Sequence, residues 1–252
     1  MSDIHVIVQA GGAGQRISSV APGTPKPLLP VGGTSMVERL LQQLTDAGIR
    51  RATVVIGPNG QGIRARVLRL AESLPRSLQL DFFEEQAALG NTGALGEIGT
   101  ENADVLLCFA DLVTDLDFAR FCEIHAQRGC NVTLTSHLEH HQLTLGELVV
   151  DGDAVHGYLE KPRKAFLICS GIALFDARAM RVARALPRPF GLADLVLATL
   201  AAGCSVTHWQ HRAYWIDVNT PELLARARED AERAAQPATS PDSRLLRQAG
   251  RP

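Results

Sequence analysis

The sequence predicts a Rossmann-like α/β fold, in which helices flank a mixed, mostly parallel sheet. Short apolar runs alternate with segments whose apolar residues recur at helical spacing, and a glycine-rich loop directly follows the first apolar run. Such alternation is typical of parallel strands joined by crossover helices. With 252 residues, of which 46% are hydrophobic, the chain can bury a large core without disulfides or structural metals.

The first predicted unit is a strand, a helix and a second strand. Residues 4–8 are apolar except for His5, as expected for a buried parallel strand. The spacing of Met36, Leu40 and Leu44 predicts a helix over residues 35–47, which Gly48 ends. The next apolar run, residues 52–56, is the second strand of the unit.

The rest of the chain continues the alternation and then becomes richer in strands. The patterns predict helices over residues 61–73, 91–98, 117–127, 192–202 and 221–235. They predict strands over residues 78–83, 105–109, 131–136, 147–150, 155–159, 166–175, 205–210 and 214–218, with a hairpin turn at 151–153. We expect one domain over residues 1–235, and a disordered tail over 236–252, where no apolar period occurs.

Composition and charge exclude several classes of function. A net charge of −2 gives no overall field that would attract nucleic acid or an acidic membrane. The beginning of the chain lacks the pattern of a signal peptide, and no stretch approaches the ~18 apolar residues of a membrane span. We therefore expect a cytoplasmic protein. The five cysteines form no CxxC pair, so we expect them to fill the core in a reducing compartment.

Residues 9–30 outline a phosphate site. Gly11, Gly12 and Gly14 follow the first strand, and without Cβ atoms they let backbone N–H groups approach a polyanion. Arg16 and Lys26 would supply positive charge to the same loop. The prolines on either side of Lys26 restrict the backbone, so that the lysine has a stiff support.

Two common phosphate-binding motifs fit this loop poorly. A P-loop would place its lysine directly after the last glycine, whereas Lys26 comes ten residues after Arg16. A dinucleotide fold would have a third glycine near Arg16 and an acidic residue at the end of the second strand, which instead runs into Gly57 and Pro58. The loop is therefore a phosphate site of another kind.

Taken with later motifs, the loop resembles the sugar-1-phosphate nucleotidyltransferases, also called nucleotide-sugar pyrophosphorylases. Their opening signature, Ala-Gly-Gly-x-Gly-x-Arg followed by Pro-Lys-Pro, occurs at residues 10–16 and 25–27. Five further blocks follow in the family's order, at residues 89–95, 106–111, 158–162, 169–175 and 214–222. The likeness covers roughly residues 3–230 and is greatest to short mannose- or heptose-1-phosphate guanylyltransferases and N-acetylmuramate-1-phosphate uridylyltransferases.

The resemblance implies an enzyme of the 2.7.7 type, which converts a nucleoside triphosphate and a sugar 1-phosphate into a nucleotide sugar and pyrophosphate. It implies that Arg16 and Lys26 neutralise the triphosphate, and that Asp111 and Asp217 hold Mg²⁺, with Mn²⁺ as a substitute. For the nucleotide it assigns Ala10, Gly11, Gly12, Gly14, Gln86, Gly90, Asn91 and Thr92. For the sugar phosphate it assigns Gly146, Glu160, Lys161, Ser170 and Gly171.

Other features leave alternatives open. Phe109-Ala110 stand where the family commonly has Asn-Gly or Gly, which favours an unusual sugar or cyclitol phosphate as acceptor. Guanine is the preferred base, while uridylyl, thymidylyl and cytidylyl transfer, a phosphonate acceptor and a regulatory nucleotide-sugar-binding subunit stay open. The apolar faces of residues 35–44 and 192–200 fit either a core or a homodimer interface. His140 and His141 are expected in a solvated loop.

Overall fold

A seven-stranded sheet forms the centre of the computed structural model, which describes residues 4–11, 22–58, 60–73, 78–98 and 103–235. The strand order is β12-β8-β11-β6-β1-β4-β5, and every neighbouring pair is parallel except the two pairs made by β11. The strands are β1 (Ile4–Gln9), β4 (Arg51–Ile56), β5 (Gln79–Glu84), β6 (Asp104–Phe109), β8 (Val132–Gln142), β11 (Arg163–Phe175) and β12 (Val206–Gln210). The mixed, mostly parallel sheet that the sequence predicts is thereby confirmed.

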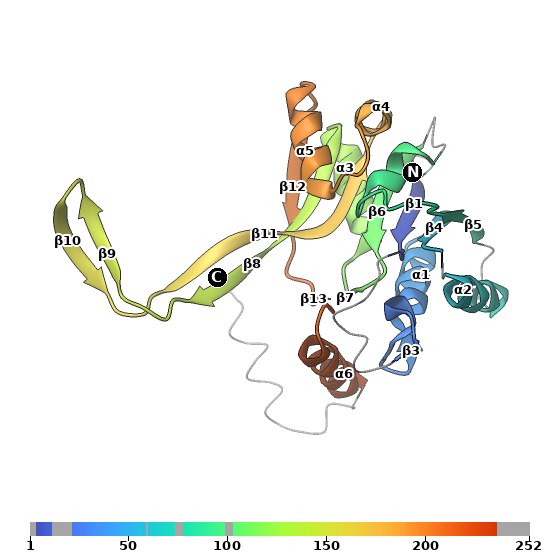
Figure 1. Cartoon of the computed structure of the whole chain (residues 1–252), viewed down its shortest axis with the longest axis horizontal. Helices are drawn as coiled ribbons and strands as arrows, with labels where there is room; N and C mark the ends of the chain where they lie inside the picture. Colours follow the sequence, from blue (N-terminus) through green and yellow to red (C-terminus); the bar gives the residue numbers. More distant parts are fainter. Residues whose placement is uncertain (1–3, 12–21, 59, 74–77, 99–102, 236–252) are drawn as a thin grey trace.

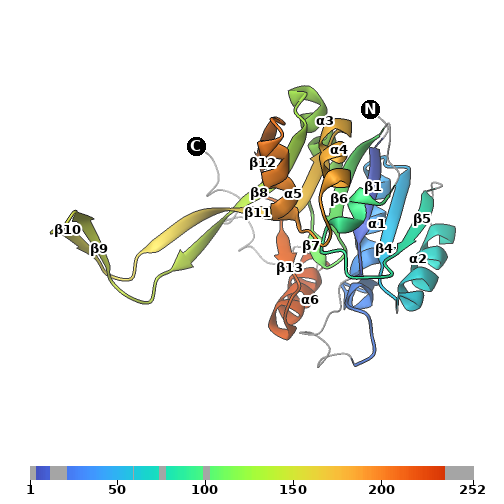
Figure 2. The ribbon, with the colours of Figure 1, turned by 45° about the horizontal axis from the view of Figure 1, so that its top comes forward.

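Helices cover both faces of the sheet (Figures 1 and 2). Val6 and Val8 of β1 pack in a core with α1 (Met36–Asp46), α2 (Gln61–Ser73) and α3 (Phe118–Arg128). Ile7 points the other way, into a core with the 3₁₀ turn η3 (Gly93–Gly96), α4 (Ala177–Ala185) and α5 (Leu192–Ala201). The side chains of a strand alternate between the two faces, so a strand buried on both sides reads as a continuous apolar run.

A third, smaller core lies at one end of the sheet. It joins the hairpin of β2 (Pro30–Val31) and β3 (Thr34–Ser35) to the pair β7 (Leu112–Thr114) and β13 (Trp215–Asp217), with α6 (Pro221–Ala235) packed outside. The 3₁₀ turn η2 (Lys26–Leu28) leads into this hairpin. The segment that carries Lys26 is therefore tied to the segment that carries Asp217.

Two strands of the sheet continue outward as a long arm (Figures 1 and 2). β8 and β11 stay paired as far as Gln142 and Arg163, and β9 (Glu147–Asp151) and β10 (Ala154–Leu159) form a hairpin beyond them. The hairpin's apolar residues, such as Leu148 and Tyr158, are exposed. The arm is thus an extension of the sheet without a core of its own.

Most predicted elements are confirmed, and the exceptions are instructive. The predicted helix over residues 91–98 is only the single 3₁₀ turn of η3. His140 and His141 lie in strand β8 and not in a loop, because β11 pairs with them. Four cysteines are buried as expected, but Cys169 is exposed. Among the described helices, none combines the length and apolar character that crossing a membrane requires.

Candidate active site

A cavity of about 1350 Å³ opens at the carboxyl ends of β1, β4, β5 and β6. From β1 the chain builds the sheet first toward β4 and β5, and then returns to add β6 on the other side. Such a switch in strand order leaves a crevice beyond the strand ends, where α/β proteins bind ligands. The size is enough for a nucleotide together with a second small substrate.

A buried carboxylate marks the side of the cavity beside β4 and β5. Glu85 follows β5 and is 8% exposed, and the side-chain amide of Gln9 donates to its Oε1 at 3.4 Å. A Cβ on Gly11 would lie only 2.7 Å from Glu85 Oε2 and 3.2 Å from the backbone nitrogen of Gly57. A side chain at residue 11 would therefore displace the Glu85 carboxylate where the strand ends meet. Burial raises the pKa of Glu85 above its ordinary value, and the hydrogen bond from Gln9 opposes that rise.

Lys26 lies beside the cavity and contacts two residues of its lining. Its ammonium nitrogen is 2.7 Å from Asp111 Oδ2 and 2.7 Å from Asn219 Oδ1. The lysine side chain is 10% exposed and that of Asp111 30% exposed. Because the lysine is held by residues from two distant segments, its charge is fixed in place next to the cavity.

The pairing of two short strands brings Asp111 and Asp217 to the same edge of the cavity. Asp217 lies opposite Leu112 in the β13–β7 pair, and the backbone N–H of Val218 donates to the carbonyl of Asp111 at 3.1 Å. Within the described ranges no group of three or more His, Cys, Asp or Glu residues forms a complete metal site. Two carboxylates beside the cavity nevertheless suit a divalent cation, which completes its coordination with water and ligand oxygens.

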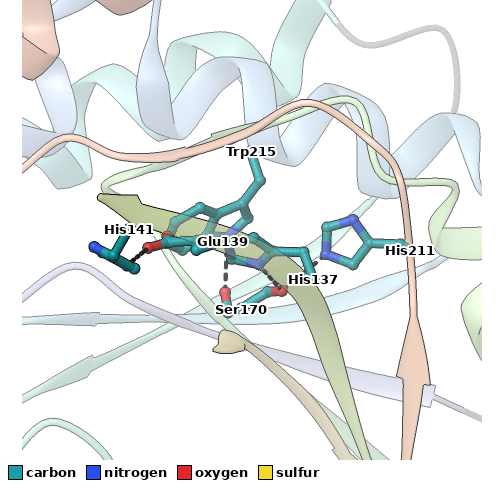
Figure 3. A network of polar contacts seen from close by, with 6 residues as sticks. All are labelled: His137, Glu139, His141, Ser170, His211 and Trp215. Atoms are coloured by element: carbon teal, nitrogen blue, oxygen red, sulfur yellow. Dashed lines mark hydrogen bonds and ion pairs between the residues drawn. The ribbon is translucent and has the colours of Figure 1, made fainter. Parts of the chain in front are cut away.

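The side of the cavity beyond β6 contains a network of polar contacts around Ser170 (Figure 3). The Ser170 hydroxyl is 2.8 Å from His137 Nδ1 and 2.8 Å from His211 Nε2, and the indole N–H of Trp215 donates to the Ser170 carbonyl at 2.8 Å. Burial lowers the pKa of His211, and the nearby His137 lowers it further, so the neutral ring is favoured. The network fixes Trp215 against the cavity.

Several residues predicted from the sequence meet at this cavity. Its lining includes Gly11, Gln86, Gly90, Asn91, Asp111, Ser170, Gly171 and Asp217. Ala10 and Thr92 are buried and are not part of the lining; the Thr92 hydroxyl donates to the Phe190 carbonyl. Gly12, Gly14 and Arg16 lie outside the described residues.

Three of the predicted sugar-phosphate residues lie on the arm. Glu160 and Lys161 follow β10, and Gly146 precedes β9. None of the three contributes to the lining of the cavity. A Cβ on Gly146 would overlap the ring of Tyr158, so packing within the arm already accounts for this glycine.

The structure adds side chains to the predicted site, although Glu85 begins the segment 85–92 from which the sequence predicts base recognition. The side chains of Gln9 and Glu85 bond to each other, Asn219 accepts from Lys26, and Trp215 and one face of α5 line the cavity. For Gln9 the available signal was a polar residue at the end of an otherwise apolar strand. For Glu85 the signal was its position directly after a parallel strand, where a side chain reaches the ligand edge.

A model of one protein family, described as nucleotidyl transferase, matches residues 5–234. This chain belongs to the nucleotidyl transferase family. Enzymes of this family generally use a divalent metal. The match covers all the described elements, from β1 to α6.

Individual members of the family are distant relatives. A mannose-1-phosphate guanylyltransferase from Mycobacterium tuberculosis is 25% identical over 243 residues, which cover 93% of this chain and 66% of that protein. A valienol-1-phosphate guanylyltransferase from Streptomyces hygroscopicus subsp. limoneus is 24% identical, and the alignment covers 93% of this chain and 73% of that protein. The chain spans less than two thirds of the length of the mycobacterial protein.

Among solved structures, HddC from Yersinia pseudotuberculosis in complex with GMP-PN has a TM-score of 0.66 and 24% identity. The alignment covers 91% of this chain and 99% of HddC. At this identity the likeness establishes the shared fold.

Proposed function

We propose that the protein transfers a guanylyl group from GTP to a sugar 1-phosphate. In this reaction a phosphate oxygen of the sugar 1-phosphate attacks the α-phosphorus of GTP, the bond between the α-phosphorus and the bridging oxygen breaks, and pyrophosphate leaves. Membership of the nucleotidyl transferase family and the names of the relatives support this proposal. The choice of base rests on one observation in the structure.

That observation is the buried carboxylate of Glu85. Guanine presents two adjacent donors, N1–H and N2–H, and an ionised carboxylate presents two adjacent acceptors. Uracil and thymine present a single N–H between two carbonyl oxygens, and adenine and cytosine present a donor beside an unprotonated ring nitrogen. Each of these bases would place an acceptor against a carboxylate oxygen. Glu85 is only 8% exposed and lines the cavity, so a base that contacts its carboxylate is favoured when it presents two donors, as guanine does.

Gln9 strengthens the same preference. Its Nε2 donates to Glu85 and so orients the carboxylate, while its Oε1 is buried without a hydrogen-bond partner among the described residues. A buried acceptor without a partner is costly until a donor satisfies it. A ligand that carries several N–H groups, as guanine does, would meet this need.

The phosphates would lie beside Lys26 and the two aspartates. Asp111 and Asp217 would hold Mg²⁺, which when bound neutralises phosphate oxygens and offsets the charge that builds on the leaving pyrophosphate. Lys26 would contact the α-phosphate from its fixed position next to Asp111. Fixed charges aimed at developing negative charge stabilise a transition state without reorganising at the moment of reaction.

Glu160 and Lys161, on the arm, lie away from the cavity lining. Lys161 and Ser170 are nine positions apart, mostly along the extended strand β11, which corresponds to roughly 30 Å at about 3.3 Å per residue. For Glu160 and Lys161 to bind the sugar phosphate, the arm has to move onto the cavity. Lys161→Gln tests this role: a raised KM for the sugar phosphate supports it, and an unchanged KM removes Lys161 from the site.

Initial rates of pyrophosphate release test the role of Glu85. We expect Glu85→Gln to lower kcat/KM for GTP at least about 100-fold, since the amide offers guanine one acceptor and one donor. ITP, which lacks the 2-amino group, should be at least about tenfold poorer than GTP for the wild type only. Glu84→Gln is the matched control, because Glu84 is not part of the cavity lining. A Glu85→Gln enzyme that keeps its GTP activity within threefold would contradict the assignment.

A further inference from the structure

The cavity has two sides, separated by β6. Glu85 lies on one side, and the wall on the other side, next to β11 and β8, is mostly apolar. β8 and β11 contribute Leu134 and Ile168, and the first turns of α5 contribute Val196 and Leu197. With two aromatic residues beside Asp111 and Asp217 they form a continuous set, which we call the apolar wall: Phe109, Leu134, Ile168, Val196, Leu197 and Trp215. If the nucleotide occupies the side of Glu85, the apolar wall faces the acceptor.

The main polar groups beside the apolar wall are already engaged within the protein. The Ser170 hydroxyl lies between His137 and His211, and the Trp215 indole N–H is bonded to the Ser170 carbonyl (Figure 3). Ser170 is fully buried. These contacts and its burial keep the Ser170 hydroxyl engaged within the protein and not presented to a ligand.

Leu197 is the member of the apolar wall that a bound acceptor could bury most. Its side chain is 65% exposed, although it lines the cavity together with Val196. An apolar group that covers Leu197 would gain from burial, whereas a hydroxylated carbon would lose its bonds to water without replacement. The wall therefore discriminates by the polarity of the acceptor.

We propose that the acceptor is a sugar or cyclitol 1-phosphate that presents an apolar group to Val196 and Leu197, such as a deoxygenated carbon, an acyl methyl group or a ring alkene. This inference rests on the proposed function, whose acceptor it narrows. A fully hydroxylated hexose 1-phosphate would be the poorer substrate. The deoxygenated carbon, the acyl methyl group and the ring alkene would all offer apolar surface to the wall, and the experiment below distinguishes between them.

Matched acceptor pairs test the inference with GTP and Mg²⁺. The pairs are mannose 1-phosphate and its 6-deoxy analogue, glucosamine 1-phosphate and its N-acetyl derivative, and a cyclitol 1-phosphate and its analogue in which a ring alkene replaces a hydroxylated carbon. The second member of each pair is the more apolar one, and the first is the hydroxylated member. We expect the more apolar member of at least one pair to have a kcat/KM about tenfold higher, which corresponds to ~1.4 kcal/mol. Preference for the hydroxylated member in every pair would overturn the inference while leaving guanylyl transfer intact.

Cys169 provides a readout that does not depend on turnover. It is exposed and lines the cavity beside Ile168, whereas the other four cysteines are buried. The apolar member of the preferred pair should protect Cys169 from a thiol reagent at a lower concentration than its hydroxylated partner. This protection without any pyrophosphate release would retain the apolar acceptor site and reject the proposed function. Equal protection by both members of every pair, or no protection, would overturn the inference.

Two variants of α5 localise the effect. Leu197→Asn should reduce the selectivity for the apolar acceptor over its hydroxylated partner about tenfold. Leu200→Asn is the control, because Leu200 is exposed on the same helix but does not line the cavity. Unchanged selectivity in Leu197→Asn, or a change of oligomeric state in light scattering without a change of selectivity, would overturn the inference.

Discussion

Lys26 and Asp111 form an ion pair at the edge of the cavity, with the ammonium nitrogen 2.7 Å from a carboxylate oxygen. The two residues are 85 positions apart, and Asn219, a further partner of Lys26, is 193 positions from it. The folded sheet therefore holds the lysine before any substrate binds. A charge fixed in this way costs little to reorganise during phosphoryl chemistry.

Replacement of Lys26 by methionine should lower kcat about 100- to 1000-fold, the usual loss when one fixed donor to a developing charge is removed. KM for GTP should change less, since the lysine is assigned to the reacting phosphate. The measurement is steady-state pyrophosphate release. Lys164→Met is the control, because Lys164 pairs with Glu147 on the arm. A kcat within fivefold of wild type would exclude Lys26 from the reaction.

Asp111→Asn should abolish measurable turnover, because the amide removes one of the two carboxylates assigned to the metal. Paramagnetic resonance of Mn²⁺ added with GTP should show weaker metal binding in the variant. Asp115→Asn is the control, because it removes a nearby carboxylate that is not part of the cavity lining. Magnesium-dependent activity of Asp111→Asn close to that of Asp115→Asn would reject the metal assignment.

The sheet was predictable because its strands are buried on both faces and read as apolar runs, as in β1 and β6. The helix α4 was missed because it is only nine residues long and buries mostly small side chains, those of Ala179 and Ala183 beside Met180. The outer part of β8 was missed because its side chains are exposed and carry no burial pattern. Pairing with β11, which a local pattern does not reveal, makes this segment a strand.

The site was predictable where a motif identifies the residue, as for Asp111 and Asp217. Gln9 and Glu85 meet only because the sheet order places the ends of β1 and β5 on either side of β4. The apolar face of α5 could not be told from a core or interface face by sequence, since all three have the same period. Its position beside the cavity comes from the three-dimensional packing.

Gly90→Ala should destabilise the fold more than the strain of a positive φ alone would, because the added Cβ would also overlap a neighbouring backbone. Gly90 has φ of +90°, and a Cβ there would overlap the backbone of Phe190. Gly48→Ala is the matched control, since Gly48 has φ of +89° and open space around it. We expect a loss of about 1–2 kcal/mol in free energy of unfolding for Gly48→Ala and at least twice that for Gly90→Ala, by urea denaturation. Equal losses would contradict the close approach.

Glu85→Gln should stabilise the fold at high pH while impairing GTP use. Because burial raises the pKa of Glu85 in the folded state, ionising it opposes folding above that pKa, and the penalty fades as pH falls toward the ordinary value of 4.5. The melting temperature of Glu85→Gln should therefore exceed that of wild type at pH 8 and approach it at pH 5. An equal difference at both pH values would contradict this origin.

Ser170→Ala should lower the free energy of unfolding by about 1–3 kcal/mol, because both histidine nitrogens that face the hydroxyl lose their partner in a buried site. Ser136→Ala is the control: among the described residues its hydroxyl bonds to His208 alone, and His208 is exposed, so that its ring can bond to water instead. Urea denaturation followed by far-UV circular dichroism measures both. A smaller loss for Ser170→Ala than for Ser136→Ala would contradict the assigned network.

The most direct test of guanylyl transfer is pyrophosphate release with GTP, UTP, dTTP, CTP and ATP, each with Mg²⁺ and a panel of hexose, heptose, amino-sugar and cyclitol 1-phosphates. The account predicts turnover with GTP at least about 100-fold above the other nucleotides, because the buried Glu85 matches the two donors of guanine alone. Preferred turnover with another nucleotide, or nucleotide binding without pyrophosphate release on every acceptor, would contradict it.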